Sequence, residues 1–332
     1  MTPRRSFQLV LLSAVGLLLA ALLCGAMLGS VTIAPHVVLK AMVGQAGPDA
    51  PILWTIRFPR VVFSALAGVA LAVSGLLLQS VLKNPLADPG IMGISSGAAL
   101  GAVIVLLVVP VASGVLPLIA FGAGMAAFGA IVVLSWDRQL SPVRLILAGV
   151  AVNAMFGVVQ AILMTLYSDR LHGVIGWLNG DLSGKSWGQV GLVAAYTLPV
   201  LAVVWWLRPL LTLLVLDDEA LGDLGIPVRR VRLGVASLAV LLAASVVAQA
   251  GLISFVGLIV PHFARLLVGS NYRRLLPLTM VAGALVVTAA DTVARLVAAP
   301  IEIPIGTVMA IVGGPVFLGM LGRRKGAAHD SV

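Results

Sequence analysis

The chain alternates between long apolar runs and short segments that carry Gly, Pro or charge. A helix needs roughly 20 apolar residues to cross the hydrocarbon core of a bilayer. The runs have about this length, so the pattern predicts ten membrane-spanning helices. The eighth run is short and interrupted, which makes it the weakest of the ten. The predicted cores are 7–28, 61–82, 92–109, 115–135, 143–166, 190–207, 233–250, 256–268, 277–297 and 305–321.

Composition supports a protein surrounded by lipid. Of the 332 residues, 61% are hydrophobic and only 10% are charged, whereas a soluble domain carries about 25% charged residues. So few charges cannot cover the surface of a protein in water. No polar stretch is long enough to form a second domain. We therefore expect an all-α polytopic membrane protein in which residues 1–332 form a single transmembrane domain.

The distribution of Lys and Arg predicts the orientation in the membrane, because cytoplasmic loops are enriched in both residues. With ten spans and a cytoplasmic N-terminus, six of the 21 Lys and Arg lie on the outer side and the other 15 on the inner side. Both termini are then cytoplasmic. The same bias accounts for the formal charge of +9 without nucleic-acid binding. The outer six are Lys40, Arg57, Arg60, Arg170, Lys185 and Arg295.

The N-terminus resembles a secretory signal, with Arg4 and Arg5 before an apolar run and then Cys24. The run from Phe7 to Leu23 is longer than the 7–15 residues typical of a signal peptide. Leu23 is also bulky where a cleavage site needs small residues. We expect an uncleaved first span. With a single cysteine, an internal disulfide and a Cys-rich metal site are excluded.

The motifs of common catalytic sites are missing. Residues 179–186 (NGDLSGKS) nearly match a phosphate-binding loop, but Asn179 replaces the first Gly that the cradle needs, and no strand precedes it. The four histidines are far apart, and no G-x-S-x-G sequence occurs. The sequence therefore predicts a protein that is not an enzyme, needs no cofactor or metal, and cannot hydrolyse ATP by itself.

The most polar stretch lies in the longest predicted cytoplasmic loop, residues 208–231. An acidic run there ends at Gly225, and the rules for helix ends predict a short helix stopped by this glycine. Two interpretations remain open: a solvated loop, or a rigid cytoplasmic protrusion that contacts another protein. The residues concerned are Asp217, Asp218, Glu219, Ala220, Leu221, Gly222 and Gly225.

Three arginines at the outer side oppose the general charge bias. Arg57 and Arg60 precede the second span, and Arg295 ends the ninth. Asp291 is four residues before Arg295, so the two can pair on one helix face. The arginines are either paired or extended toward the membrane surface, or they dock acidic groups of a partner, because guanidinium binds carboxylate in a bidentate way.

Polar residues recur on one face of the fifth span. Asn153, Gln160 and Tyr167 are spaced by seven residues. Polar side chains in spans usually face another helix or a cavity. Hydrogen bonding between helices and lining of a transport pathway both fit this pattern.

Glycines at four-residue spacing indicate close helix packing, either inside the subunit or at a subunit interface. Gly93, Gly97 and Gly101 form such a series in the third span, and Gly25 and Gly29 form one in the first. Ten spans are also compatible with two inverted repeats of five, a common plan in transporters.

Four blocks of residues, in this order and over nearly the whole chain, resemble the FecCD-type permease family. Members of this family are the membrane subunits of type II ABC importers for iron chelates, haem and cobalamin. The blocks are Arg57–Arg60 with Gly68–Gly75 and Gln79; Asn84–Pro89 with Gly93–Gly97; Phe255–His262 with Arg265; and Asp291–Arg295 with Glu302–Gly306 and Gly313–Phe317.

The resemblance implies a homodimer in the bacterial inner membrane, with the transport pathway at the dimer axis. Two copies of a separate ABC ATPase act on the cytoplasmic side, and a periplasmic binding protein delivers the solute. By resemblance, Asp217–Gly225 is the coupling loop, while Arg57, Arg60 and Arg295 dock acidic residues of the binding protein. The fifth span then lines the pathway.

The solute is less well defined by the residues. The stretch from Asp88 to Gly97 resembles haem-importing members most, with ferric siderophores and cobalamin as alternatives. A function of another class is secondary transport driven by an ion gradient. Such a transporter needs buried carboxylates, and Asp291 is the only strong candidate within a span. A membrane enzyme is disfavoured by the missing catalytic residues.

Overall fold

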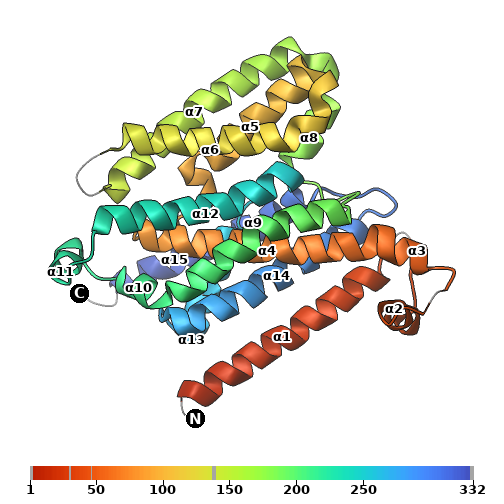
Figure 1. Ribbon diagram of the computed structural model, residues 1–332, viewed down its shortest axis with the longest axis horizontal. Coiled ribbons are helices and arrows are strands. Elements are labelled where there is room, and N and C mark those ends of the chain that lie inside the picture. Colours follow the sequence, from red (N-terminus) through yellow and green to blue (C-terminus); the bar gives the residue numbers. More distant parts are fainter. Residues whose placement is uncertain (1–2, 30, 46, 137–139, 330–332) are drawn as a thin grey trace.

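The computed structural model describes residues 3–29, 31–45, 47–136 and 140–329, and these ranges contain helices but no β-strand (Figure 1). Seven of their helices are long and apolar enough to cross a membrane. Three shorter apolar helices span Ile94–Val108, Val256–Val268 and Ile305–Gly319. Together they correspond one to one with the ten predicted spans, so the predicted fold class is confirmed.

The helices alternate between long spans and short connecting elements. The spans are α1 (Pro3–Met27), α4 (Phe58–Val81), α5 (Ile94–Val103) with the π-helical turn η3 (Ile104–Val108), α6 (Leu116–Leu134), α7 (Pro142–Leu166), α9 (Trp187–Trp206), α12 (Val228–Ala250), α13 (Val256–Val268), α14 (Tyr272–Leu296) and α15 (Ile305–His329). The connecting elements are α2 (Pro35–Met42), α3 (Ala50–Ile52), η1 (Leu53–Arg57), η2 (Pro89–Met92), η4 (Pro110–Val115), η5 (Ser168–Arg170), α8 (Leu171–Leu178), α10 (Arg208–Leu213) and α11 (Asp218–Asp223).

Helix α4 forms the centre of the bundle. Of its most apolar window, 78% is buried, and it packs against α14, α12, α13 and α9. Helices α1 and α7 are peripheral, with 11% and 17% of their windows buried. In Figure 1, α5 to α8 lie together along one side and α1 runs along the opposite side. Short α11 lies at one end of the helices, and α2 and α3 lie at the other.

Glycines allow the central helices to touch backbone to backbone. A Cβ atom on Gly75 of α4 would lie 1.9 Å from the carbonyl oxygen of Gly257 in α13, and one on Gly68 would lie 2.1 Å from that of Gly283 in α14. Gly97 of α5 faces the α6 backbone in the same way. The glycine series in the third span therefore serves packing inside the subunit.

Substitution of Gly75 by Ala tests this packing. The added methyl group has no space against the α13 backbone, so the free energy of unfolding should fall by about 1–3 kcal/mol. Gly191→Ala in α9 is the matched control, because no atom lies within 4 Å of its Cβ position and Ala favours a helix over Gly. Thermal unfolding in detergent measures both. Equal melting temperatures would show that α4 and α13 do not depend on this contact.

The second span is longer than predicted. The helix runs without a break from Ala50 to Val81, whereas the expected core began at residue 61. The prediction treated Arg57 and Arg60 as residues outside the membrane because they are charged. In the structure their side chains are buried against other parts of the chain, which allows the helix to continue through them.

The eighth span is short because the chain before it is not helical. Residues 251–255 are irregular, and both Gly251 (φ 72°) and Phe255 (φ 68°) adopt left-handed backbone angles. Backbone hydrogen bonds hold both ends of this segment: the Gly251 N–H donates to the Val247 carbonyl at 2.9 Å, and the Phe255 carbonyl accepts from the Ile259 N–H at 2.9 Å. Irregular backbone at membrane depth is tolerated only when protein groups satisfy it in this way.

Candidate functional sites at the two ends of the helices

The acidic segment forms the predicted short helix, α11. It lies at the end of the bundle that the Lys and Arg distribution predicts to be cytoplasmic, called the inner end below (Figure 1). Leu221 is fully buried in the main hydrophobic core and anchors α11. Gly225, with φ of 73°, follows the helix and allows the chain to turn away. Around it, α10 and the first turn of α12 occupy much of the predicted loop 208–231.

Asp218 fixes α11 to two other elements. Its carboxylate lies 2.9 Å from Nζ of Lys83, after α4, and 2.7 Å from Nη2 of Arg232, on α12. Desolvation by itself raises the pKa of this carboxyl, but the hydrogen bonds from Lys83 and Arg232 hold it below its usual value. The α11 helix is therefore fixed to α4 and α12 and is not a flexible solvated loop. Its exposed residues are Glu219, Ala220, Gly222 and Asp223, and Asp217, which precedes the helix, is exposed as well.

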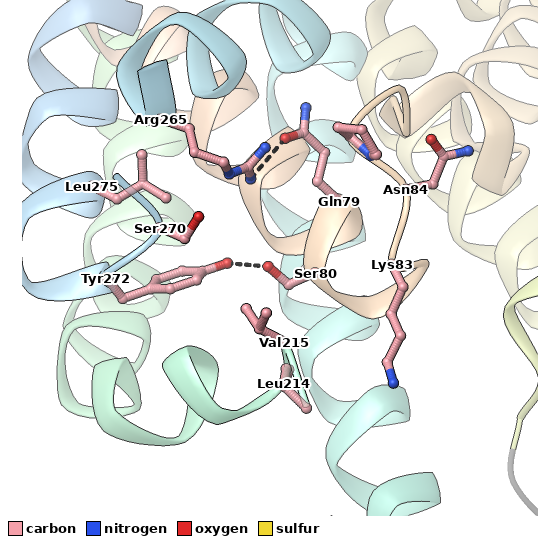
Figure 2. Close-up of a pocket in the computed structure, with 11 residues that line it drawn as sticks. Gln79, Ser80, Lys83, Asn84, Leu214, Val215, Arg265, Ser270, Tyr272 and Leu275 are labelled. Atoms are coloured by element: carbon pink, nitrogen blue, oxygen red, sulfur yellow. Dashed lines mark hydrogen bonds between the residues drawn. The ribbon is translucent and has the colours of Figure 1, made fainter. Parts of the chain in front are cut away.

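Beside α11, a cavity of about 230 Å³ separates the end of α4 from the start of α14 (Figure 2). On one wall, Nη2 of Arg265 donates to Oε1 of Gln79 at 3.1 Å. The amide nitrogen of Gln79 in turn donates to the Leu258 carbonyl at 3.2 Å. The hydroxyls of Ser80 and Tyr272 are hydrogen bonded to each other. These bonds join α4, α13 and α14 at the inner end.

At the opposite, outer end, four charged residues form a network, in which Arg60, Asp291 and Arg295 are buried and Glu302 is partly exposed. Nη2 of Arg60 lies 2.9 Å from Oδ1 of Asp291, and Nη1 lies 2.8 Å from Oε2 of Glu302. Nε of Arg295 lies 3.4 Å from Oδ2 of Asp291. The pair predicted between Asp291 and Arg295 is thus confirmed. The bonds from Arg60 to Asp291 and Glu302 join α4 to α14 and to the loop before α15.

The same region fastens α1 to the bundle through backbone carbonyls. Nη2 of Arg57 donates to the Val31 carbonyl at 2.8 Å, and Nη2 of Arg295 donates to the Gly25 carbonyl at 3.0 Å. The residue exposures of Arg57, Arg60 and Arg295 are 6%, 7% and 5%. The structure therefore brings the three predicted docking arginines together, with their guanidinium groups directed to internal acceptors. Docking itself stays a prediction.

Glu302 is the part of the network closest to solvent, with 43% of its side chain exposed. Its Oε2 also accepts a hydrogen bond from Ser183 at 2.8 Å. Desolvation raises the pKa of the Glu302 carboxyl, whereas Arg60 and Ser183 lower it, and the net value is below the usual one. Its role as the partner of Arg60 could not be predicted from spacing, since the two residues are 242 positions apart.

Residues 179–186 form part of the outer end and do not make a phosphate cradle. Nζ of Lys185 donates to the Gln249 carbonyl at 2.8 Å, and the residue is buried. Burial lowers the pKa of this amine. The Ser186 and Gln189 side chains form a capping box that begins α9. The segment thus closes the outer end of the fold.

The polar face of α7 is directed toward α5 and the loop before it. Nδ2 of Asn153 donates to the Gly90 carbonyl at 3.0 Å, and Nε2 of Gln160 donates to the Ser96 carbonyl at 3.1 Å. Hydrogen bonding between these elements is confirmed. Tyr167 follows the last residue of α7, with the Arg170 guanidinium 5.9 Å from its ring centre. Pathway lining by Asn153, Gln160 and Tyr167 stays a prediction.

No metal-binding group is found among the residues that the structure describes: no three His, Cys, Asp or Glu side chains lie together in a suitable cluster.

Comparison with known proteins identifies the family. Residues 17–323 match the model of the FecCD transport family. The chain is 35% identical over 295 residues to the Fe(3+)-citrate import system permease protein YfmE of Bacillus subtilis, covering 89% of each chain. It is 37% identical to the hemin transport system permease protein HmuU of Yersinia pestis, over 82% of this chain and 84% of that protein.

A solved structure gives the same result. A metal-chelate type ABC transporter in an inward-facing conformation is similar with a TM-score of 0.83 and 28% identity, covering 95% of this chain and 99% of that one. The family match runs from within α1 to within α15 and includes the eight spans between them. The chain therefore belongs to the FecCD transport family, as a multi-pass permease subunit of an ABC importer in the bacterial inner membrane.

Proposed function

We propose that this permease moves an iron chelate, with haem as the first candidate, from periplasm to cytoplasm, and that a separate ATPase supplies the energy. The observation that carries the proposal is α11, an acidic helix held by Leu221 and Asp218 at the inner end. Because this helix is fixed to the core, a displacement of α11 by the ATPase is transmitted to the spans as a rigid-body movement. A solvated loop would deform instead. No catalytic residue is required of the permease itself.

In this mechanism two copies of the permease form a homodimer, and two ABC ATPases bind their α11 helices. Closure and opening of the ATPases move α11, and the ion pairs of Asp218 carry the movement to α4 and α12. The two halves then open the pathway alternately to each side. A periplasmic binding protein supplies the affinity for the solute, so the pathway needs few charged groups.

Helix α7 is the candidate for both the pathway and the dimer contact. Only 17% of its apolar window is buried within one subunit, so most of this helix is left to contact either lipid or another span, and its polar Asn153 and Gln160 favour a place beside a pathway. A second copy of the chain would cover part of this face. Its strongly exposed apolar residues include Leu147, Val150, Met155, Val158, Ile162 and Leu166.

The haem assignment rests on the stretch from Asp88 to Gly97 and on its position. This stretch contacts α7 through Asn153 and Gln160, so it lies beside the candidate pathway. Relatives with similar identity include permeases for hemin in Yersinia pestis and for cobalamin in Halobacterium salinarum. Ferric siderophores and cobalamin are therefore the alternative solutes.

Uptake into proteoliposomes tests the solute. The permease is reconstituted with its ATPase and binding protein, and haem, ferric citrate, ferric hydroxamate and cobalamin are supplied separately. We expect ATP-dependent uptake of haem above the other three. Uptake of ferric citrate or cobalamin without uptake of haem would refute the haem assignment and leave the permease assignment intact.

Secondary transport is disfavoured by the surroundings of Asp291. A coupling carboxylate has to exchange protons or bind sodium during the cycle. Asp291 instead lies between the guanidinium groups of Arg60 and Arg295, with 2% of its side chain exposed. Asp291, the strongest candidate for ion coupling, is therefore already paired with Arg60 and Arg295.

Docking of the binding protein at the outer end is proposed to involve carboxylate exchange. Arg60 already holds Asp291 and Glu302, so an incoming carboxylate would compete with the more exposed of the two, Glu302. Loss of Glu302 would leave part of the Arg60 guanidinium without a partner. The binding protein could then supply the missing acid.

Glu302→Gln should therefore strengthen docking of the binding protein, by up to about fivefold, since exposed ion pairs contribute about 0.2–1 kcal/mol. Asp169→Asn is the matched control, because its side chain is 75% exposed and belongs to another outer loop. Surface plasmon resonance on nanodisc-embedded permease gives both dissociation constants. Weaker docking by Glu302→Gln would show that Glu302 does not compete with the partner.

A further inference from the structure

Two tryptophans and two arginines meet at the inner end of α9. Trp206, the last residue of α9, is 79% exposed. The Arg208 guanidinium stacks 3.7 Å from the ring centre of Trp205, and its Nε donates to the Trp205 carbonyl at 2.7 Å. Arg273 comes from the first turn of α14. The group Trp205, Trp206, Arg208 and Arg273 is called the inner Trp–Arg patch below.

The patch borders a hollow, and within the part of the chain that the structure describes it carries positive charge without an acidic ion-pair partner. Trp205, Trp206, Arg208, Pro209 and Arg273 line a cavity of about 400 Å³. Arg273 also borders a second cavity of about 370 Å³, together with Arg274 and residues near the start of α1. Among the described residues, no carboxylate lines either cavity. None of the ion pairs found among the described residues involves Arg208, Arg273 or Arg274.

An apolar surface continues from the patch toward the middle of the membrane. Leu198 and Ala202 lie eight and four residues before Trp206, on the same face of α9, and both are exposed. Residues at this spacing form a stripe along a helix. A ligand bound here thus meets cations at the membrane surface and an apolar track below it, which is the chemistry of a phospholipid with an anionic headgroup.

We propose that the inner Trp–Arg patch binds an anionic phospholipid of the cytoplasmic leaflet. Arg208 and Arg273 contact the headgroup phosphate, Trp206 lies at the level of the headgroups, and an acyl chain follows the Leu198 side of α9. Tryptophan is enriched at membrane interfaces, and basic pockets between spans on the cytoplasmic side suit acidic lipid headgroups.

A second basic surface at the inner end provides a comparison. There, the Arg229 guanidinium lies 3.9 Å from the ring centre of Trp136, and Arg230 lines the same cavity. Asp218 of α11 also lines it, so a phosphate would meet a carboxylate. The comparison surface has the same residue types as the inner Trp–Arg patch but a less favourable charge for an anionic lipid.

Native mass spectrometry of the purified permease tests the proposal. The protein is mixed with phosphatidylglycerol or phosphatidylcholine, and the lipid retained is counted for wild type, for Arg208→Gln with Arg273→Gln, and for Arg229→Gln with Arg230→Gln. Each cation near an anionic membrane contributes about 1 kcal/mol, so the first pair should weaken phosphatidylglycerol binding by roughly 30-fold. The second pair should change it little.

The proposal would be overturned by equal loss in the two double variants, by equal retention of phosphatidylcholine, or by displacement of the lipid by inorganic phosphate. Unchanged lipid retention with weaker binding of the ATPase would make the patch a protein contact instead. If the double variant does not fold, Trp206→Ala keeps both charges, and we expect it to reduce phosphatidylglycerol retention. Full retention by a folded Trp206→Ala variant would also contradict the proposal.

Discussion

Asp291→Asn should lower the free energy of unfolding by about 3–5 kcal/mol, the usual cost of breaking a buried ion pair. The carboxylate is the only anion between Arg60 and Arg295, and its side chain is 2% exposed. Asparagine keeps the shape of the side chain but removes the charge. Glu302 would then be the remaining acid near three buried arginines. Thermal and denaturant unfolding of the detergent-solubilised protein measure the loss.

The control for this prediction is Asp223→Asn, an exposed acid on α11, which should leave stability unchanged. A double variant with Arg60→Gln separates charge from shape. Removing both partners should cost less than the sum of the two single losses, because neither is left unpaired. Additive losses, or a melting temperature of Asp291→Asn equal to that of the control, would contradict the proposed role of the network.

Asp218→Lys should reduce ATP-driven uptake by about tenfold or more, the size of a typical coupling free energy between sites. The new lysine would face Lys83 and Arg232, and repulsion would release α11 from α4 and α12. The ATPase would still hydrolyse ATP, but its movement would not reach the spans. Uptake and ATP hydrolysis measured in the same proteoliposomes separate these two effects.

Asp169→Lys provides the same change of charge at an exposed acid far from α11, and it should transport normally. The melting temperature of Asp218→Lys should fall below that of the control, because the buried Arg232 side chain loses the Asp218 carboxylate, but the protein should still fold, since Leu221 keeps α11 in the core. Normal uptake by Asp218→Lys would show that the ion pairs of α11 do not transmit the ATPase movement. Lost uptake together with a collapsed melting temperature would point to misfolding instead.

The spans could be predicted from the sequence because lipid imposes a simple pattern. A long apolar run has few alternatives to a helix in a membrane, and all ten predicted cores correspond to helices. The boundaries were less accurate where charges are buried. Arg57 and Arg60 were interpreted as residues outside the membrane, and only their distant partners show that the helix includes them.

Local features of the candidate sites were also predictable. The acidic run and Gly225 specify α11, and the four-residue spacing of Asp291 and Arg295 specifies their pair. Long-range partners were not predictable, since no local rule links Arg60 to residues 231 and 242 positions away. The resemblance to a known family places Arg60, Asp291 and Glu302 in motifs. The spacing of these motifs along the chain does not show which residues form ion pairs.

The central claim is that a separate ATPase drives transport, and it is tested most directly by measuring which energy source supports uptake. Purified permease is placed in proteoliposomes with the binding protein and labelled solute, either with its ATPase and ATP or alone under a proton gradient. The account predicts uptake only when the ATPase and ATP are both present, and none with the gradient alone. Uptake by the permease alone under the proton gradient would contradict it and would identify the chain as a secondary transporter.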